Sequence, residues 1–176
     1  NCNGTRFLRS ANQGDDWADL GQKFNFLSAI FLLTDNAGNI YTRTCKNFYV
    51  EVSHDGGENW APLLISAENL QIRYVLENKQ GHLLAYTIDN RYFLSSNNGN
   101  NWAEITPPYD MSTINDKAVF DSNDNIYIFG STVYKSSDSG VHWDVLTTNS
   151  VGLKKHAFIG DSIVVAVHDN GNLFKS

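Results

Sequence analysis

One eight-residue motif occurs four times along this 176-residue chain. It has the pattern S-x-[DN]-x-G-x-x-W, and its four tryptophans are separated by 43, 42 and 41 residues. A fixed period of this length is the sequence mark of a repeat architecture, in which each repeat is one supersecondary unit stacked on its neighbours. The residues at the motif positions are Ser10, Asn12, Gly14 and Trp17; Ser53, Asp55, Gly57 and Trp60; Ser95, Asn97, Gly99 and Trp102; and Ser136, Asp138, Gly140 and Trp143.

Each motif lies between two short apolar, β-prone runs, so it is predicted to be the turn of a β-hairpin. The Asp or Asn side chain can accept hydrogen bonds from backbone N–H groups further along the turn. The glycine supplies a backbone position with positive φ. The tryptophan is expected to bury its ring against its own hairpin. These roles are structural rather than catalytic.

A second repeated turn signal precedes each motif except the first. It reads Asp35–Tyr41, Glu77–Leu84 and Asp121–Tyr127, with a shortened version at Ile159–Val164. The two kinds of turn together predict four strands per unit, with first strands at 29–34, 73–77, 118–121 and 156–159 and second strands at 40–43, 83–87, 126–129 and 163–167. Four strands at this period form a propeller blade.

The predicted fold is therefore all-β: a β-propeller of four-stranded antiparallel blades, with about four repeats of roughly 42 residues filling 1–176 as a single domain or a propeller fragment. Blade boundaries are expected near residues 26, 71, 115 and 154. The motif resembles the Asp-box, or BNR repeat, of sialidases and other secreted β-propellers. This resemblance implies a folding element on the outer rim, remote from the active site. The four copies are called box 1 to box 4 below.

The phase of the repeat leaves the closure of the ring open. The chain begins with the third and fourth strands of a blade, continues with three whole blades, and ends with three further strands. That is one strand more than a closed four-blade ring needs. We expect an arc of a larger ring, because larger rings are the commoner home of Asp-boxes. The alternatives are a four-blade ring with a spare strand, or self-pairing of two chains through open blade edges, which invite strand addition.

Composition excludes some classes of partner. The net charge is −6, without the basic stripe that nucleic acid requires. No run is apolar for long enough to span a bilayer, so no membrane insertion is expected. Few cysteines and lysines with many Asn, Ser and Gly suggest an extracytoplasmic location. Asn3–Thr5 matches a glycosylation sequon, a triplet that is also common by chance. Cys2 and Cys45 occupy equivalent points of neighbouring blades, which are usually too far apart for a disulfide.

A search for catalytic chemistry assigns no residue. The resemblance to sialidases implies three arginines for the substrate carboxylate and an Arg-Ile-Pro motif, yet none of the five arginines is followed by Ile-Pro. No spacing marks a pair of carboxylates for glycoside hydrolysis. The histidines are scattered, without the close ligand spacing of a metal site. No catalytic residue, metal site or cofactor is therefore predicted.

A binding site is easier to place. In a propeller, the connections from fourth to first strand and from second to third strand share one face, which we call the loop face. Loops held by a rigid scaffold carry most binding functions. The candidate binding residues there are Tyr109, Asp110, Arg91 and Lys155. We expect a non-catalytic binding or scaffold module that recognises a protein or carbohydrate ligand. The alternative is part of a sialidase-like glycoside hydrolase whose catalytic residues lie outside this chain.

Overall fold

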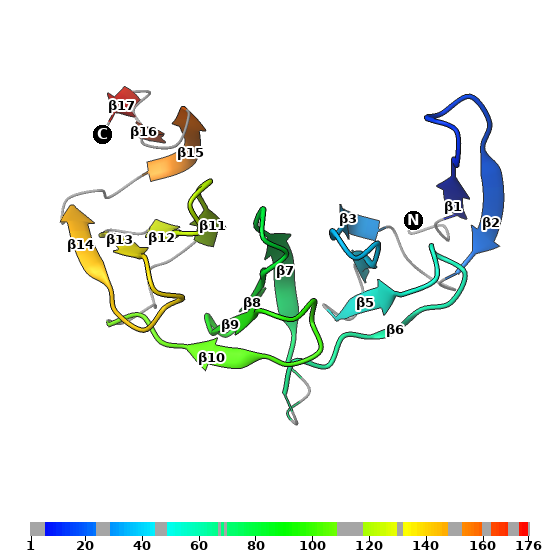
Figure 1. Ribbon diagram of the computed structural model, residues 1–176, viewed down its shortest axis with the longest axis horizontal. Coiled ribbons are helices and arrows are strands. Elements are labelled where there is room, and N and C mark those ends of the chain that lie inside the picture. The colour runs from blue at the N-terminus through cyan, green and yellow to red at the C-terminus, as the bar shows by residue number, and fades with distance from the viewer. Residues whose placement is uncertain are drawn as a thin grey trace.

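The computed structural model describes residues 6–23, 29–44, 49–66, 68, 70–108, 118–129, 132–147, 153–159, 163–168 and 173–175. Within these ranges the chain forms antiparallel sheets (Figure 1). The strands are β1 (Arg6–Arg9), β2 (Ala18–Gln22), β3 (Ala29–Thr34), β4 (Ile40–Thr44), β5 (Val50–Ser53), β6 (Ala61–Pro62), β7 (Ile72–Glu77), β8 (Leu83–Thr87), β9 (Tyr92–Ser95), β10 (Ala103–Ile105), β11 (Ala118–Phe120), β12 (Ile126–Phe129), β13 (Val133–Ser136), β14 (Asp144–Thr147), β15 (Leu153–Ile159), β16 (Ile163–His168) and β17 (Leu173–Lys175).

The sheets form five consecutive units, which we call blades I to V. Blade I is β1–β2, blade II is β3–β6, blade III is β7–β10, blade IV is β11–β14, and blade V is β15–β17. Each strand pairs with its sequence neighbour, so every sheet is a meander. The prediction of four-stranded antiparallel blades is confirmed in blades II, III and IV.

The clearest departure from the predicted strands is at the start of blade V. We expected Lys155 in a loop of the loop face, before a strand at 156–159. Strand β15 instead begins at Leu153, and Lys155 pairs with Val167 of β16. The sequence pattern missed the start of this strand because two adjacent lysines interrupt the apolar run.

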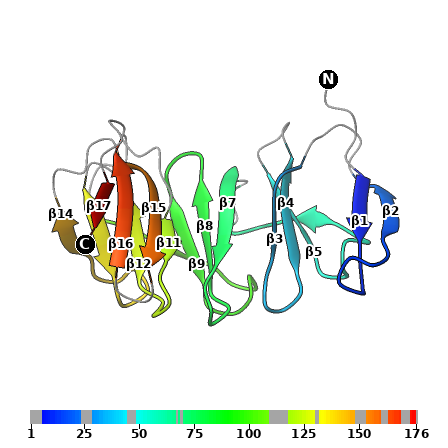
Figure 2. The same cartoon turned by 90° about the horizontal axis from the view of Figure 1, so that it is seen from above.

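The blades stand side by side along an open arc. The β1–β2 sheet lies at one end of this arc and the β15–β17 sheet at the other (Figure 1). The chain does not close into a compact four-blade ring, so that alternative is wrong. The turns of the β1–β2 and β3–β4 hairpins lie at one end of the strands, and the β8–β9 turn lies at the opposite end (Figure 2).

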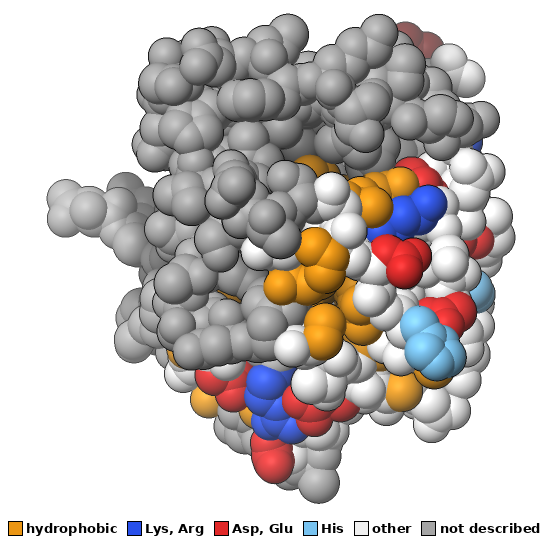
Figure 3. All heavy atoms as spheres, turned by 90° about the vertical axis from the view of Figure 1, so that its left-hand side faces the viewer, with side chains coloured by type: hydrophobic (Ala, Val, Ile, Leu, Met, Phe, Trp, Pro, Cys, Tyr) orange, Lys and Arg blue, Asp and Glu red, His pale blue; other side chains and the backbone are white. Residues whose placement is uncertain are grey.

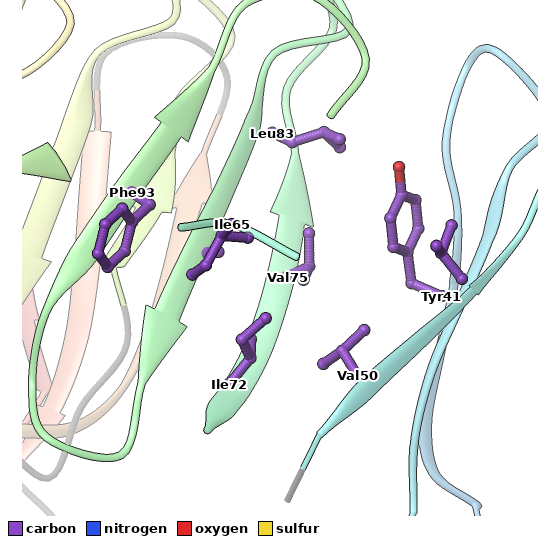
Figure 4. Close-up of a cluster of buried hydrophobic side chains, with 9 residues drawn as sticks. Tyr41, Val50, Ile65, Ile72, Val75, Leu83 and Phe93 are labelled. Atoms are coloured by element: carbon purple, nitrogen blue, oxygen red, sulfur yellow. The ribbon is translucent and has the colours of Figure 1, made fainter. Parts of the chain in front are cut away.

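The hydrophobic core lies between the blades. In one cluster, Tyr41 and Val50 of blade II face Ile72, Val75 and Leu83 of blade III (Figure 4). The second strands of blades III and IV are covered on both sides, because all residues of β8 and β12 are buried. Burying one large aliphatic side chain contributes about 1.5–3 kcal/mol. Stacking of blades, rather than any single sheet, therefore stabilises the fold.

Candidate functional site

The four box turns share one hydrogen-bond network. In each box the serine Oγ–H donates to Oδ1 of the Asp or Asn at 2.8–3.0 Å, and the serine oxygen accepts from the glycine N–H at 2.7–2.9 Å. The same Oδ1 accepts a backbone N–H four residues on, at 2.8–2.9 Å. The tryptophan Nε1–H donates to the glycine carbonyl at 3.0–3.1 Å. The serine, Asp or Asn, and tryptophan side chains of each box therefore form hydrogen bonds within their own turn.

Two consecutive residues in each box have positive φ. The box glycine has φ between +80° and +99°, and the residue before it has φ between +55° and +72°. Gly56 and Asn98 accept this conformation readily, whereas Gln13 and Ser139 adopt it at some cost. The glycine was predicted, but the position before it carries four different residues, so the sequence pattern gave no signal for it.

The box tryptophans pack across the blade boundary. The Trp60 ring lies 5.0 Å from Phe7 of blade I, between ring centroids. Trp102 packs on the cluster between blades II and III, and Trp143 on the cluster between blades III and IV. Trp17 differs from these three, because it is 61% exposed. The expectation that each box ring is buried is wrong for Trp17.

The box glycines are also points of close approach between blades. A Cβ built on Gly140 would lie 2.8 Å from Ile105 of β10, and one on Gly57 would lie 3.1 Å from Leu20 of β2. Each of these neighbours belongs to the preceding blade. A glycine is therefore required at these box positions for two reasons. Its backbone has a positive φ, and a side chain of the preceding blade packs where a Cβ atom would lie.

The two boxes that carry aspartate hold it ionised. The backbone and side chain of Asn59 and the Ser53 hydroxyl lower the pKa of Asp55 to about 2. The backbone and side chain of His142 lower the pKa of Asp138 to about 2 in the same way. A hydrogen-bonded carboxylate of this kind is a fixed acceptor and not a proton donor at neutral pH.

The described part of the loop face is centred on Arg91. Its guanidinium donates to both carboxylate oxygens of Glu104 at 2.8 and 2.7 Å and to Glu68 at 2.6 Å. Its Cζ lies 5.1 Å from the centroid of the Phe93 ring. Hydrogen bonds to Glu104 and Glu68 raise the pKa of Arg91, and the bond from Arg91 lowers the pKa of Glu104. We call these three charged residues the Arg91 clamp.

The Arg91 clamp ties together segments that are distant in sequence. Glu68 lies in the connection between blades II and III, Arg91 follows the β8–β9 turn, and Glu104 lies in β10. The Ile88 N–H also donates to the Gln71 carbonyl at 2.9 Å. The described part of this face is therefore held by both side-chain and backbone bonds.

The predicted binding residues do not gather into one described site. Arg91 is on the loop face, but its guanidinium is engaged by two carboxylates. Lys155 lies in β15. Tyr109 and Asp110 lie outside the described residues, as do Cys2 and Cys45.

Sequence reasoning missed the partners of Arg91, although a periodic signal was present. An arginine four residues before the box serine pairs with an acid two residues after the box tryptophan in two blades. These pairs are Arg6 with Asp19 in blade I and Arg91 with Glu104 in blade III. The two members of each pair are separated by 13 residues. The spacing places them on neighbouring strands of one hairpin, which brings opposite charges within reach.

The described ranges hold neither a cluster of metal ligands nor a membrane-spanning helix. They contain no group of three His, Cys, Asp or Glu side chains that could hold a metal ion. They also contain no helix that is long and apolar enough to cross a membrane.

The meander sheets, the stacked four-stranded blades and the repeated box turns define the class of fold: this is a β-propeller fold, present here as an open arc. No protein-family model matches the sequence, and no curated protein matches it.

Solved structures show the same fold at low identity. A structure described as YCF48 bound to D1 peptide is 15% identical and aligns over 98% of this chain with a TM-score of 0.69. The GH74 enzyme of Niastella koreensis is 14% identical over 97%, with a TM-score of 0.69, and the GH74 xyloglucanase of Xanthomonas campestris is 16% identical over 96%, with a TM-score of 0.63. The chain spans 58%, 27% and 33% of those chains, respectively.

Proposed function

We propose that the chain is a non-catalytic binding or scaffold module that works outside the cytoplasm and recognises a protein segment or a glycan through its loop face. The observation that carries this proposal is the Arg91 clamp. It makes the described part of the loop face a rigid platform, and rigid scaffolds that present loops are typical of binding proteins. A propeller of the same fold has been solved with a D1 peptide, which makes a peptide the first ligand to test.

A glycoside hydrolase is the second candidate, because GH74 enzymes share the fold. A hydrolase of this kind needs one carboxyl group whose pKa is raised, so that it can protonate the leaving group. The Arg91 clamp does the opposite, because Arg91 lowers the pKa of Glu104. Burial raises the pKa of Glu51 in β5, which makes Glu51 the carboxylate to test first.

The two functions are separated by parallel binding and turnover measurements. The purified chain is applied to an array of immobilised peptides and glycans, and it is incubated with xyloglucan and with a fluorogenic sialoside. We expect binding without turnover of either sugar. Turnover that is abolished by Glu51→Gln would favour the hydrolase instead.

The role of the clamp is tested by a matched pair of variants. Arg91→Ala should weaken binding to any peptide or glycan found on the array by about tenfold, since the two loop-face segments lose their common tie. Arg6→Ala removes the equivalent arginine of blade I and should leave binding unchanged. Equal loss in both variants would contradict a binding site on the loop face of blade III.

A further inference from the structure

The connection between blades II and III carries an exposed leucine. Leu64 lies four residues after the box 2 tryptophan and is 70% exposed. The equivalent positions in the other boxed blades carry Gly21, Thr106 and Thr147. The next residue, Ile65, is 7% exposed and belongs to the core cluster between blades II and III. An apolar side chain is therefore present at a position where the repeat otherwise carries glycine or threonine, and it lies outside the core.

A second exposed apolar residue is held against the same connection. Ile88, in the turn between β8 and β9, is 40% exposed, and its N–H donates to the Gln71 carbonyl at 2.9 Å. At the other end of the connection, the Leu63 N–H donates to the Val50 carbonyl at 2.8 Å. Blades II and III each have a described blade on either side. Leu64 and Ile88 are thus exposed on a fixed part of the loop face, at a blade boundary that is complete.

The charges beside these two residues are mostly negative. Glu68 lies in the connection with its side chain 65% exposed, and Asp89 is exposed in the β8–β9 turn. Together with Arg91 and Glu104 they comprise one positive and three negative charges, a net charge of −2. Exposed carboxylates of this kind attract a cation, and they do so more strongly at low ionic strength.

The guanidinium of Arg91 is not available to an anionic ligand. Each of its three nitrogens already donates to Glu104 or Glu68. The Phe93 ring beneath it is 3% exposed, so it offers no open aromatic face to a sugar ring. On the face of the molecule that Figure 3 shows, the coloured Lys and Arg side chains likewise lie beside Asp and Glu side chains rather than in a basic patch of their own. These features favour a cationic ligand over an anionic one.

We propose that this surface, made of Leu64, Glu68, Ile88 and Asp89, binds a segment of a partner protein that carries lysine or arginine beside large aliphatic side chains. An aliphatic side chain of the segment covers Leu64 and Ile88, while a neighbouring cation lies against Glu68 and Asp89. Burial of the apolar groups supplies affinity, and the charges orient the segment. The inference rests on the proposed function, and it narrows the ligand from a protein or glycan to a basic, apolar protein segment.

Three fluorescently labelled peptides of equal length test the class of ligand. One contains lysine and leucine, a second has glutamate in place of lysine, and a third has serine in place of leucine. Fluorescence anisotropy gives the Kd of each for the purified chain. The lysine–leucine peptide should bind about tenfold more tightly than either of the others, since only this peptide matches both the apolar and the acidic residues. Added salt should weaken its binding.

Two matched pairs of variants locate the binding. Leu64→Ser should weaken binding of the lysine–leucine peptide by about tenfold, whereas Val141→Ser, on box 4 at 71% exposure, should leave it unchanged. Asp89→Asn should weaken binding by about threefold. Asp15→Asn removes the same charge from an exposed position of box 1 and should leave binding unchanged.

The possible failures are distinguishable. Equal losses of affinity in the Leu64 and Val141 variants, or no loss in either, would overturn this surface as the binding site. An acidic peptide or a glycan whose binding is abolished by Leu64→Ser would overturn the basic ligand while leaving the binding function in place. If none of the labelled peptides and none of the immobilised peptides and glycans bound, both this inference and the proposed function would be wrong.

Discussion

At the scale of single residues, one serine hydroxyl organises each box turn. Ser53 is fully buried, donates to Asp55 and accepts the N–H of Gly57. Ser53→Ala should lower the free energy of unfolding by about 1–3 kcal/mol, because it leaves a buried N–H without its acceptor. Urea unfolding measures this change. Ser10→Ala removes the same bonds from a serine that is only half-buried and should cost less. An equal loss of unfolding free energy would show that burial does not set the effect.

The aspartates of boxes 2 and 4 predict an acid dependence of stability. Their pKa of about 2 lies below the ordinary 3.8. A group whose pKa is lowered by folding contributes stability above its unfolded pKa and loses it as the pH falls through the folded value. The free energy of unfolding should therefore decrease between about pH 4 and pH 2.

The control for this prediction is already present in the chain, since boxes 1 and 3 carry Asn12 and Asn97 at the same position. A variant with both Asp55→Asn and Asp138→Asn keeps the Oδ1 acceptors but cannot titrate at them. Urea unfolding at a series of pH values should show a shallower acid slope for this variant than for the parent. Identical slopes would mean that other carboxylates account for the loss.

At the scale of strands and turns, the box tryptophans act as links between blades. Trp60→Ala should lower the free energy of unfolding by about 2 kcal/mol, less than the 3–5 kcal/mol of a fully buried ring because Trp60 is half-buried. Trp17→Ala should change it by less than about 0.5 kcal/mol, as for other exposed positions. Thermal or urea unfolding compares the two variants. Equal losses would place the stabilising contact inside each hairpin instead.

The strands and turns were predictable because their chemistry is local. Asx turns, glycines with positive φ and alternating β-prone runs leave marks within a few residues. The direction in which Trp60 points was not predictable, because it depends on how one blade stacks on the next. The partners of Arg91 could have been found from the recurring 13-residue spacing. Lys155 was placed in a loop because two adjacent lysines interrupt an apolar run.

At the scale of the whole molecule, neighbouring contacts set the stability of the arc. Repeat arrays of this kind are approximately sums of unit and interface contributions. The blade number and the closed or open state depend on blade-to-blade geometry, which no local pattern encodes. The sequence therefore predicted the propeller, its blades and an open arc, while the packing of the box tryptophans across the blade boundaries required the structure.

The close approach of Gly140 to Ile105 has a consequence for how such a chain can diversify by duplication. The two residues belong to different blades, so a duplicated or transplanted blade carries only half of each joint. A new blade fits where its box glycine can receive a side chain of the preceding blade, as Gly57 receives Leu20, Gly99 receives Tyr41 and Gly140 receives Ile105. Loop sequences can then drift freely, while these two joint positions decide which blades can be neighbours.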